Sequence, residues 1–150
     1  MNIASQTESI PDTSAGRKPC DETILVVEDE PDLRDLIVQV LEDRGYTVVG
    51  AGSGKQALQR WAERRHRIDL LLTDMSIPDG MSGYQLAKRL KNDDPDLRVI
   101  YTSGHVVGVP GTQLADVDER QFLAKPYRPS TLLELIRTFL DSPPLPANVA

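Results

Sequence analysis

The chain is expected to be an α/β protein in which five β-strands alternate with helices in one doubly wound parallel sheet. Short apolar runs alternate along it with longer segments in which apolar residues recur at helical spacing. The short runs are almost continuously apolar, which is typical of parallel strands that helices cover on both faces. Right-handed crossovers make the doubly wound sheet the simplest arrangement of such βα units.

The first part of the domain predicts a strand, a helix and a second strand. The first strand covers residues 24–28. Asp32 near the start of the helix and Arg44 near its end suit the helix dipole, and Gly45 is a natural stop. A short β-rich run at 46–49 forms the next strand. The apolar residues that recur at helical spacing in this helix are Leu33, Leu36, Ile37, Val40 and Leu41.

The middle of the chain predicts a helix, a strand, a loop and another helix. Ser53 can cap the first of these helices and Ser82 the second. Between them, residues 69–73 form the third strand and residues 75–81 the loop that follows it. The apolar positions expected in the two helices are Ala57, Leu58, Trp61 and Ala62, then Tyr84, Leu86, Ala87 and Leu90.

The last part predicts two more strands, at 99–102 and 122–124. The segment between them, 106–119, is weakly helical because it contains Gly108, Pro110 and Gly111. Ser130 can cap a final helix, whose apolar positions are Leu132, Leu133, Leu135, Ile136, Phe139 and Leu140.

The length and composition predict one domain between two tails. The chain has 150 residues, of which 39% are hydrophobic and 27% charged, as in ordinary soluble globular proteins. Residues 1–22 are rich in polar residues and Pro, and residues 142–150 contain a Pro run, so both are expected to be flexible tails around a domain at 23–141. The initial Met and the Pro-rich end favour a complete small protein, with a fragment of a larger kinase as the alternative.

Charge and cysteine content exclude several classes of partner and compartment. The net charge is −6, and the basic residues gather no further than Arg64, Arg65 and Arg67, so we expect no nucleic-acid partner. No apolar stretch approaches the roughly 18 residues of a membrane span, and no secretory signal is present, so we expect no membrane partner. Cys20 is the single cysteine, which fits a cytoplasmic protein without disulfides.

Polar residues follow four of the predicted strands at the point where each strand ends. They are Glu28 with Asp29, then Asp74, Ser103 and Lys125. Because the carboxyl ends of parallel strands meet at one edge of a sheet, where ligands bind, these side chains should lie together. Three carboxylates, one hydroxyl and one lysine suit a divalent cation and a phosphoryl group.

The carboxylates point to Mg²⁺, which takes oxygen ligands and needs only one or two protein carboxylates. Asp29 and Asp74 are candidate direct ligands, and Glu28 acts directly or through water. Asp74 can also be a nucleophile for a phosphoryl group, with Lys125 balancing charge and Ser103 donating a hydrogen bond. Each residue alone has a plainer explanation, as a helix cap, an acidic helix start or a turn. Their joint occurrence at four strand ends favours the site.

The glycine-rich run at 50–55 resembles a phosphate-binding loop but does not match it. That motif needs Gly where the chain has Val49, and Ser or Thr where it has Gln56. His66 and His105 are too far apart in the sequence for a metal motif. Trp61 is expected to cover the core.

Over residues 22–141 the chain resembles the receiver domain of two-component response regulators. The likeness rests on four motifs: Val26-Val27-Glu28-Asp29-Glu30, Leu72 to Gly83, Thr102-Ser103-Gly104, and Phe122-Leu123-Ala124-Lys125-Pro126. It implies a flavodoxin-like sheet with strand order 2-1-3-4-5. It also implies that the Lys125-Pro126 peptide bond is cis.

The resemblance implies a role for each site residue. Asp74 would take a phosphoryl group from a histidine of a kinase or of a phosphotransfer protein. Glu28, Asp29 and Asp74 would bind Mg²⁺, and the backbone carbonyl of Ser76 would complete the metal site. Ser103 would be the switch hydroxyl, Phe122 the switch aromatic and Lys125 the lysine that contacts the phosphoryl group. By the same analogy, Ser76 and His105 would flank the path of the hydrolytic water and tune the phosphoryl lifetime, which we expect to be long.

The sequence departs from the family's common pattern at several positions. The acidic pair is Glu-Asp instead of Asp-Asp, Gly104 replaces the frequent Ala, and Phe122 replaces the frequent Tyr. The run from Thr102 to His105 is similar to that of receivers attached to hybrid histidine kinases. These departures concern the mode of output more than the chemistry.

The expected function is a phosphorylation-controlled signalling switch, not a turnover enzyme. An aspartate-nucleophile phosphohydrolase is the alternative from another class, but it would carry an acid at position 76, where the chain has Ser. A degenerate receiver that binds partners without phosphate is disfavoured because all the site residues are present. The output would be a downstream protein partner or a homodimer, through the face formed by the segment 106–119, the strand 122–124 and the last helix.

Overall fold

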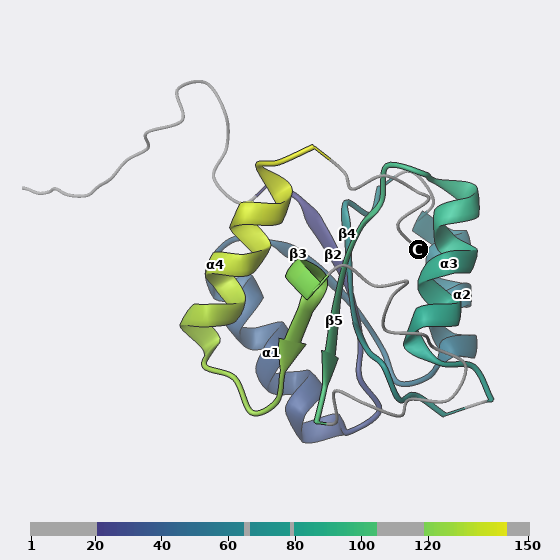
Figure 1. Ribbon diagram of the computed structural model, residues 1–150, viewed down its shortest axis with the longest axis horizontal. Coiled ribbons are helices and arrows are strands. Elements are labelled where there is room, and N and C mark those ends of the chain that lie inside the picture. The colour runs from purple at the N-terminus through teal and green to yellow at the C-terminus, as the bar shows by residue number, and fades with distance from the viewer. Residues whose placement is uncertain (1–20, 65–66, 79, 105–118, 144–150) are drawn as a thin grey trace, which may run out of the picture.

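A single parallel sheet forms the centre of the molecule (Figure 1). The computed structural model describes residues 21–64, 67–78, 80–104 and 119–143. The sheet has five strands in the order β3-β2-β4-β5-β6, which is the predicted order 2-1-3-4-5 counted along the chain. The flavodoxin-like, doubly wound arrangement is therefore confirmed. The strands are β2 (Thr23–Val27), β3 (Thr47–Ala51), β4 (Leu70–Asp74), β5 (Arg98–Ser103) and β6 (Phe122–Ala124).

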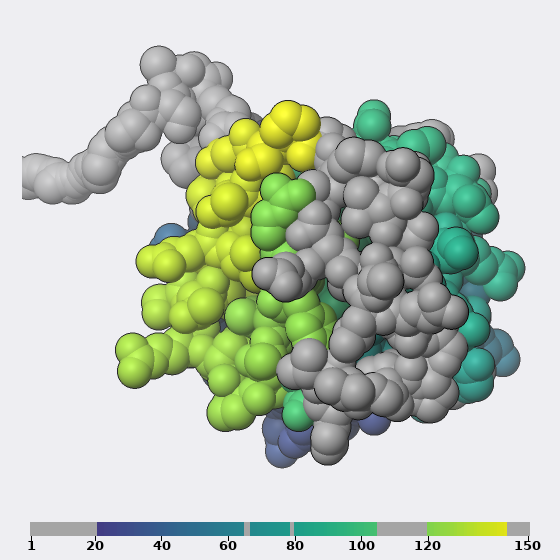
Figure 2. Space-filling view, viewed as in Figure 1, coloured from purple at the N-terminus to yellow at the C-terminus, as the bar shows by residue number. Residues whose placement is uncertain are grey.

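Helices cover both faces of the sheet (Figure 1). Alternate residues of β2 point to opposite faces, so Ile24 packs with the α1 and α4 side and Leu25 with the α2 and α3 side. In the space-filling view, α4 and α3 lie on opposite sides of the face shown (Figure 2). The helical elements are α1 (Pro31–Asp43), α2 (Gly54–Arg64), α3 (Gly83–Asp93), the short 3-10 helix η2 (Glu119–Gln121) and α4 (Pro129–Leu140).

The apolar strand sequences are buried as expected for a sheet that is covered twice. All five residues of β4 are buried, and so are the four from Ile24 to Val27 in β2. Trp61 is also buried in the core, and its indole N–H donates to Asp93 Oδ2 at 2.9 Å, which ties α2 to α3. The expectation that Trp61 covers the core is confirmed.

Several predicted helix and strand ends are confirmed, and others shift by one or two residues. Gly45, which follows α1, has a φ of 99°, a conformation that favours glycine. The Ser53 hydroxyl accepts a hydrogen bond from the Gln56 N–H, and Ser82 forms a capping box with Gln85. The second strand runs on to Ala51, beyond the predicted end at residue 49, because its last two residues pair with the end of β2.

The prediction that Ser130 caps the last helix was wrong. That helix begins at Pro129, with Arg128 as the N-cap residue and no side-chain cap. Proline has a fixed φ and lacks an N–H group, so it is well suited to the first helical position, and Ser130 lies inside the first turn.

Some sequence-based expectations lie outside the described residues. They include His66, His105, Cys20, nearly all of the segment 106–119 and most of the two tails. Within the part of the chain that the structure describes, no helix has the length and apolar character that crossing a bilayer requires.

Candidate metal and phosphoacceptor site

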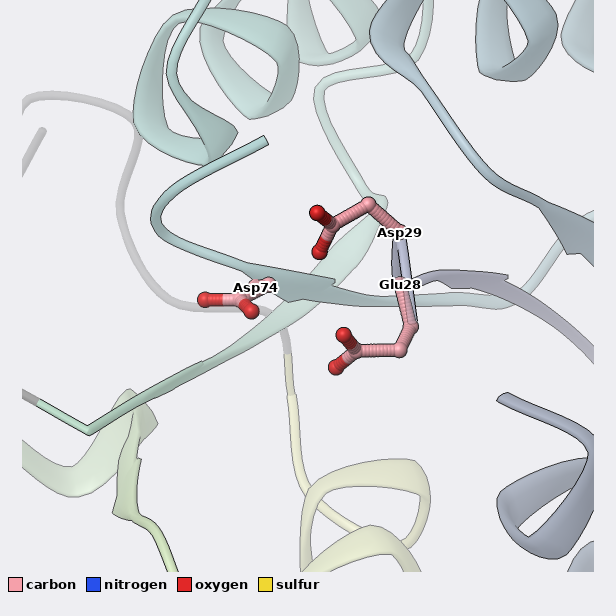
Figure 3. Close-up of side chains that lie close together, drawn as sticks. All are labelled: Glu28, Asp29 and Asp74. Carbon is pink, nitrogen blue, oxygen red and sulfur yellow. The ribbon is translucent and has the colours of Figure 1, made fainter. Parts of the chain in front are cut away.

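Three carboxylates converge at the carboxyl end of the sheet, as predicted (Figure 3). Glu28 and Asp29 follow β2, and Asp74 ends the neighbouring strand β4, whose Thr73 pairs with Val27. One oxygen from each carboxylate can be chosen so that all three lie within 4.8 Å of one another. Glu28 is only 2% exposed and Asp74 8%, whereas Asp29 is exposed to solvent.

Backbone hydrogen bonds hold the acidic pair at the turn between β2 and α1. The Glu28 N–H donates to the Ala51 carbonyl at 3.0 Å, which continues the sheet one residue past β2. Oε2 of the Glu28 side chain accepts a hydrogen bond from the Glu30 N–H at 3.2 Å. Pro31 then begins α1 at a position where its missing N–H has no cost.

Asp74 is held by its neighbours on both sides. The next residue, Met75, donates its N–H to the Thr102 carbonyl at 2.8 Å, and its own carbonyl accepts the Gly83 N–H at 2.8 Å. The Ser76 N–H donates to Asp74 Oδ1 at 3.2 Å. The phosphoacceptor candidate therefore has a fixed carboxylate at a fixed strand end.

Lys125 bridges the two buried carboxylates. Its Nζ lies 2.8 Å from Asp74 Oδ2 and 2.9 Å from Glu28 Oε1. Its backbone N–H donates to the Ser103 carbonyl at 2.8 Å, so β5 holds the start of the loop that carries the lysine. The peptide bond between Lys125 and Pro126 is cis, as the resemblance implied.

Burial and charge shift the pKa values of this bridge. Burial raises the pKa of Glu28, and the hydrogen bond from Lys125 offsets this only in part. Burial alone would lower the pKa of Lys125, but its hydrogen bonds with Asp74 and Glu28 outweigh that effect, and the pKa of Lys125 is raised. The lysine is therefore a persistent cation, and it faces more negative charge than it can balance.

The residues present fit a magnesium ion. Three carboxylates lie together, and the one ammonium group among them pairs with only two, which leaves a negative excess that a hard divalent cation would compensate. Within the described residues, the Asp29 carboxylate has no hydrogen bond, so its oxygens are the most available to bind a metal ion. Both Glu28 oxygens are already engaged by Lys125 and by the Glu30 N–H, which favours contact with the ion through water.

Ser103, Phe122 and Ser76 are the other predicted site residues that the structure describes. Ser103 ends β5 and is buried beside the strand that carries Asp74, since Thr102 pairs with Asp74. Phe122 is half-buried, pairs with Tyr101, and packs against the core on the α2 and α3 side. Ser76 is exposed next to Asp74, and His105 lies outside the described residues.

Sequence reasoning missed two residues that contact the site. Arg34 donates from Nη1 to the Glu28 carbonyl at 2.7 Å, and Gly83 lies directly against the Asp74 backbone. The six-residue separation of Arg34 from Glu28 was a weak signal of this contact. A helix that begins at Pro31 places the residues of its first turn close to the end of β2. The sequence offered no signal for the close approach of Gly83.

Comparisons with known proteins agree with this geometry. The family model of the response regulator receiver domain matches residues 24–137. The response regulator receiver protein CpdR of Brucella abortus is 32% identical over 117 residues, which cover 78% of this chain and 95% of CpdR. The sensor kinase CckA of the same organism is 33% identical over 119 residues, which cover 79% of this chain but only 12% of CckA.

The fold agrees with solved receiver structures as well. The crystal structure of a response regulator receiver domain protein from Clostridium thermocellum superposes with a TM-score of 0.69 at 28% identity, covering 80% of this chain and 94% of that one. The residues that the family model matches, 24–137, include Glu28, Asp29, Asp74, Ser103 and Lys125. The chain belongs to the response regulator receiver domain family.

Proposed function

We propose that Asp74 accepts a phosphoryl group from a histidine of a kinase or of a histidine phosphotransfer protein, and that the phosphorylated domain controls a protein partner. The observation that carries this proposal is the convergence of the Glu28, Asp29 and Asp74 carboxylates at the end of the sheet, with the Lys125 ammonium bridging Glu28 and Asp74. A receiver of this kind is a phosphoacceptor with slow self-dephosphorylation, not a turnover enzyme. We place it in the cytoplasm.

The transfer needs positioning and charge compensation more than covalent chemistry from the protein. A carboxylate oxygen of Asp74 attacks the phosphorus in line, the bond from phosphorus to the imidazole nitrogen breaks, and the donor histidine leaves as imidazole. Lys125 lies within hydrogen-bond distance of Asp74 Oδ2, so it can follow the negative charge onto a phosphoryl oxygen. Bound Mg²⁺, held by Asp29, Asp74 and the Ser76 carbonyl with Glu28 nearby, would neutralise the phosphoryl oxygens.

An apolar hollow next to Lys125 supports a protein as the phosphodonor. It lies between α1 and α4 and includes Leu36, which is 54% exposed and is the large exposed hydrophobic residue of the described chain. A protein that brings its histidine to Asp74 must cover the edge of the sheet, and this surface borders that edge. The hollow is lined by Leu33, Leu36, Ile37, Val40, Lys125, Pro126, Tyr127, Pro129 and Leu132.

The output is proposed to involve Ser103 and Phe122. A phosphoryl group on Asp74 would draw the Ser103 hydroxyl and Lys125 toward it and would repack β5, β6 and the elements after them. A downstream partner or a second copy of the chain would read that change. The lifetime roles of Ser76 and His105 stay predictions.

Mass spectrometry after incubation with acetyl phosphate and Mg²⁺ tests the phosphoacceptor. Wild-type protein should gain one phosphoryl group, and Asp74→Asn should gain none. Asp69→Asn is a matched control, because Asp69 precedes the same strand at its other end and accepts the Thr23 N–H at 2.8 Å. The control should be labelled as wild type is, and unchanged labelling of Asp74→Asn would refute the assignment.

The metal requirement has its own readout. Titration with Mg²⁺ should move the amide resonances of residues 28, 29 and 74 in the wild-type protein, and Asp29→Ala should remove most of that binding. A wild-type spectrum that does not respond to Mg²⁺ would show that the metal site is wrong.

A further inference from the structure

Arg34 reaches from the first turns of α1 to the peptide group inside the acidic pair. Its Nη1 donates to the backbone carbonyl of Glu28 at 2.7 Å. That carbonyl belongs to the peptide that joins Glu28 to Asp29. The orientation of this peptide sets the direction in which the Asp29 side chain leaves the backbone.

Gly52 leaves room for the Arg34 guanidinium group, whereas the nearby Gly50 does not need to. A Cβ atom built on Gly50 would lie 3.7 Å from Arg34 Cδ, an ordinary contact, whereas one on Gly52 would lie 2.9 Å from Arg34 Nη1, which is too close. Gly52 also donates its N–H to Gln56 Oε1 at 2.7 Å, which fixes its own backbone. The glycine-rich run that resembles a phosphate-binding loop therefore makes space for a guanidinium group.

The two members of the acidic pair are held in different ways. The Glu28 carboxylate is tied to Lys125 and to the Glu30 N–H. The Asp29 carboxylate is exposed, and no hydrogen bond is assigned to it among the described residues. The position of Asp29 therefore depends on the backbone, and the side chain that holds this backbone is Arg34.

We propose that Arg34 is a positioning residue for the metal site, and that Gly52 leaves the space that its guanidinium group occupies. By fixing the Glu28–Asp29 peptide, Arg34 keeps the Asp29 carboxylate near Asp74, so that the two can share one cation. This inference rests on the proposed function, because it assumes that Mg²⁺ binds at these carboxylates. The outer partners of metal ligands commonly affect metal affinity in this way.

The sign of the effect separates positioning from simple electrostatics. The Arg34 guanidinium is a positive charge close to the metal site, so its charge alone opposes the binding of a cation. If charge were its only role, Arg34→Ala would bind Mg²⁺ more tightly than wild type. If it holds the peptide, Arg34→Ala binds Mg²⁺ more weakly despite the loss of repulsion.

Mg²⁺ titrations of the full chain, followed by amide resonances, provide the test. Arg34→Ala should weaken Mg²⁺ binding by about tenfold. Gly52→Ala should also weaken it, because the added methyl displaces the guanidinium while the positive charge remains. Gly50→Ala is the matched control, since its methyl makes only ordinary contacts, and its affinity should match that of wild type.

The carbonyl carbon resonance of Glu28 in metal-free protein gives a second readout, independent of the metal. Loss of the hydrogen bond should shift this resonance in Arg34→Ala and in Gly52→Ala but not in Gly50→Ala. Unchanged or tighter Mg²⁺ binding in both altered variants, or a Glu28 carbonyl that does not shift, would overturn the positioning role. A wild-type protein that binds no Mg²⁺ would instead overturn the proposed metal site, and the inference with it.

Discussion

The two ends of the sheet use similar side chains to different effect. The structure describes six buried polar or charged residues, and five of them lie at the carboxyl ends of strands: Glu28, Thr73, Asp74, Thr102 and Ser103. The sixth, Gln121, lies at the opposite end and donates to the Val99 carbonyl at 3.1 Å. Burying a polar group reduces the stability of the folded protein unless the group is hydrogen-bonded or ion-paired. The concentration of buried polar residues at the carboxyl end therefore points to a functional site there.

At the amino end, charged side chains form hydrogen bonds and ion pairs with groups at the ends of helices and strands. Arg98 donates to the carbonyls of Phe139 and Ser142, which closes the end of α4 on the start of β5. Arg137 pairs with Glu22 and Asp141, and these groups remain partly exposed. Arg98 therefore has carbonyl partners, and Arg137 has accessible carboxylate partners. At the carboxyl end, one lysine pairs with two of three clustered carboxylates, and a metal ion could compensate the remaining negative charge.

The largest expected effect comes from removing the lysine of the carboxyl end. In metal-free protein, Lys125→Met should lower the free energy of unfolding by about 3 kcal/mol, because it leaves the buried Glu28 and Asp74 carboxylates without a counter-charge. Saturating Mg²⁺ should restore part of that stability, since the ion supplies the missing positive charge and binds the folded state. Denaturant unfolding with and without Mg²⁺ measures both changes.

Arg137→Met is the matched substitution at the amino end. Its ion pairs are partly exposed, so the loss should be only about 1 kcal/mol and should not respond to Mg²⁺. The contrast between the two ends would be wrong if this variant lost as much stability as Lys125→Met, or if Mg²⁺ rescued it equally.

The second effect tests how tightly the carboxyl end is packed. A Cβ atom on Gly83 would overlap the backbone carbonyl of Asp74, and Gly83 has no left-handed φ that would add conformational strain. Gly83→Ala should therefore lower the free energy of unfolding by about 2 kcal/mol. It should also slow labelling by acetyl phosphate, because Asp74 must shift to make room.

Gly104→Ala is the control for this prediction. Gly104 follows Ser103 near the same site, but an added Cβ would meet nothing within 4 Å. Its stability should stay within about 0.5 kcal/mol of wild type, and its labelling rate should be unchanged. Equal losses of stability and labelling rate in the two variants would mean that the close approach of Gly83 to Asp74 is not the cause.

The fold and the functional end of the sheet were predictable because local patterns encode them. Apolar runs gave the strands, and the residue that follows each run must lie at the edge where parallel strands end. Asp74, Glu28 and Asp29 were found in this way before any contact was known. Ser103 and Lys125 were found likewise, because each follows its own apolar run.

The contacts that organise the site were not predictable from the same patterns. Arg34 acts on a backbone carbonyl, and any arginine on that face of the helix has the same local sequence signal. The bridge from Lys125 to both carboxylates joins residues 97 and 51 positions apart, which only the closed sheet brings together. The prediction for Ser130 failed in the opposite way, because the sequence suggested a helix cap that does not form. Pro129 fits the first helical position better than Ser130 fits the N-cap position.

The smallest expected effect concerns Gln121, the one buried polar residue that the structure describes at the amino end. β6 pairs only with residues 101–103 of β5, so the Val99 carbonyl lies before the paired stretch, and the Gln121 amide N–H reaches it instead. Gln121→Leu removes that donor and should cost about 1 kcal/mol of unfolding free energy, the usual value for one hydrogen bond. Its rate of labelling by acetyl phosphate and its Mg²⁺ affinity should equal those of wild type, because Gln121 precedes β6 at the amino end of the strand, away from the clustered carboxylates. Ser103→Ala at the other end of β5 is the counterpart, and we expect it to accept phosphate yet to couple poorly to the partner surface. A Gln121→Leu protein with normal stability but altered phosphorylation would reverse the roles assigned to the two ends of the sheet.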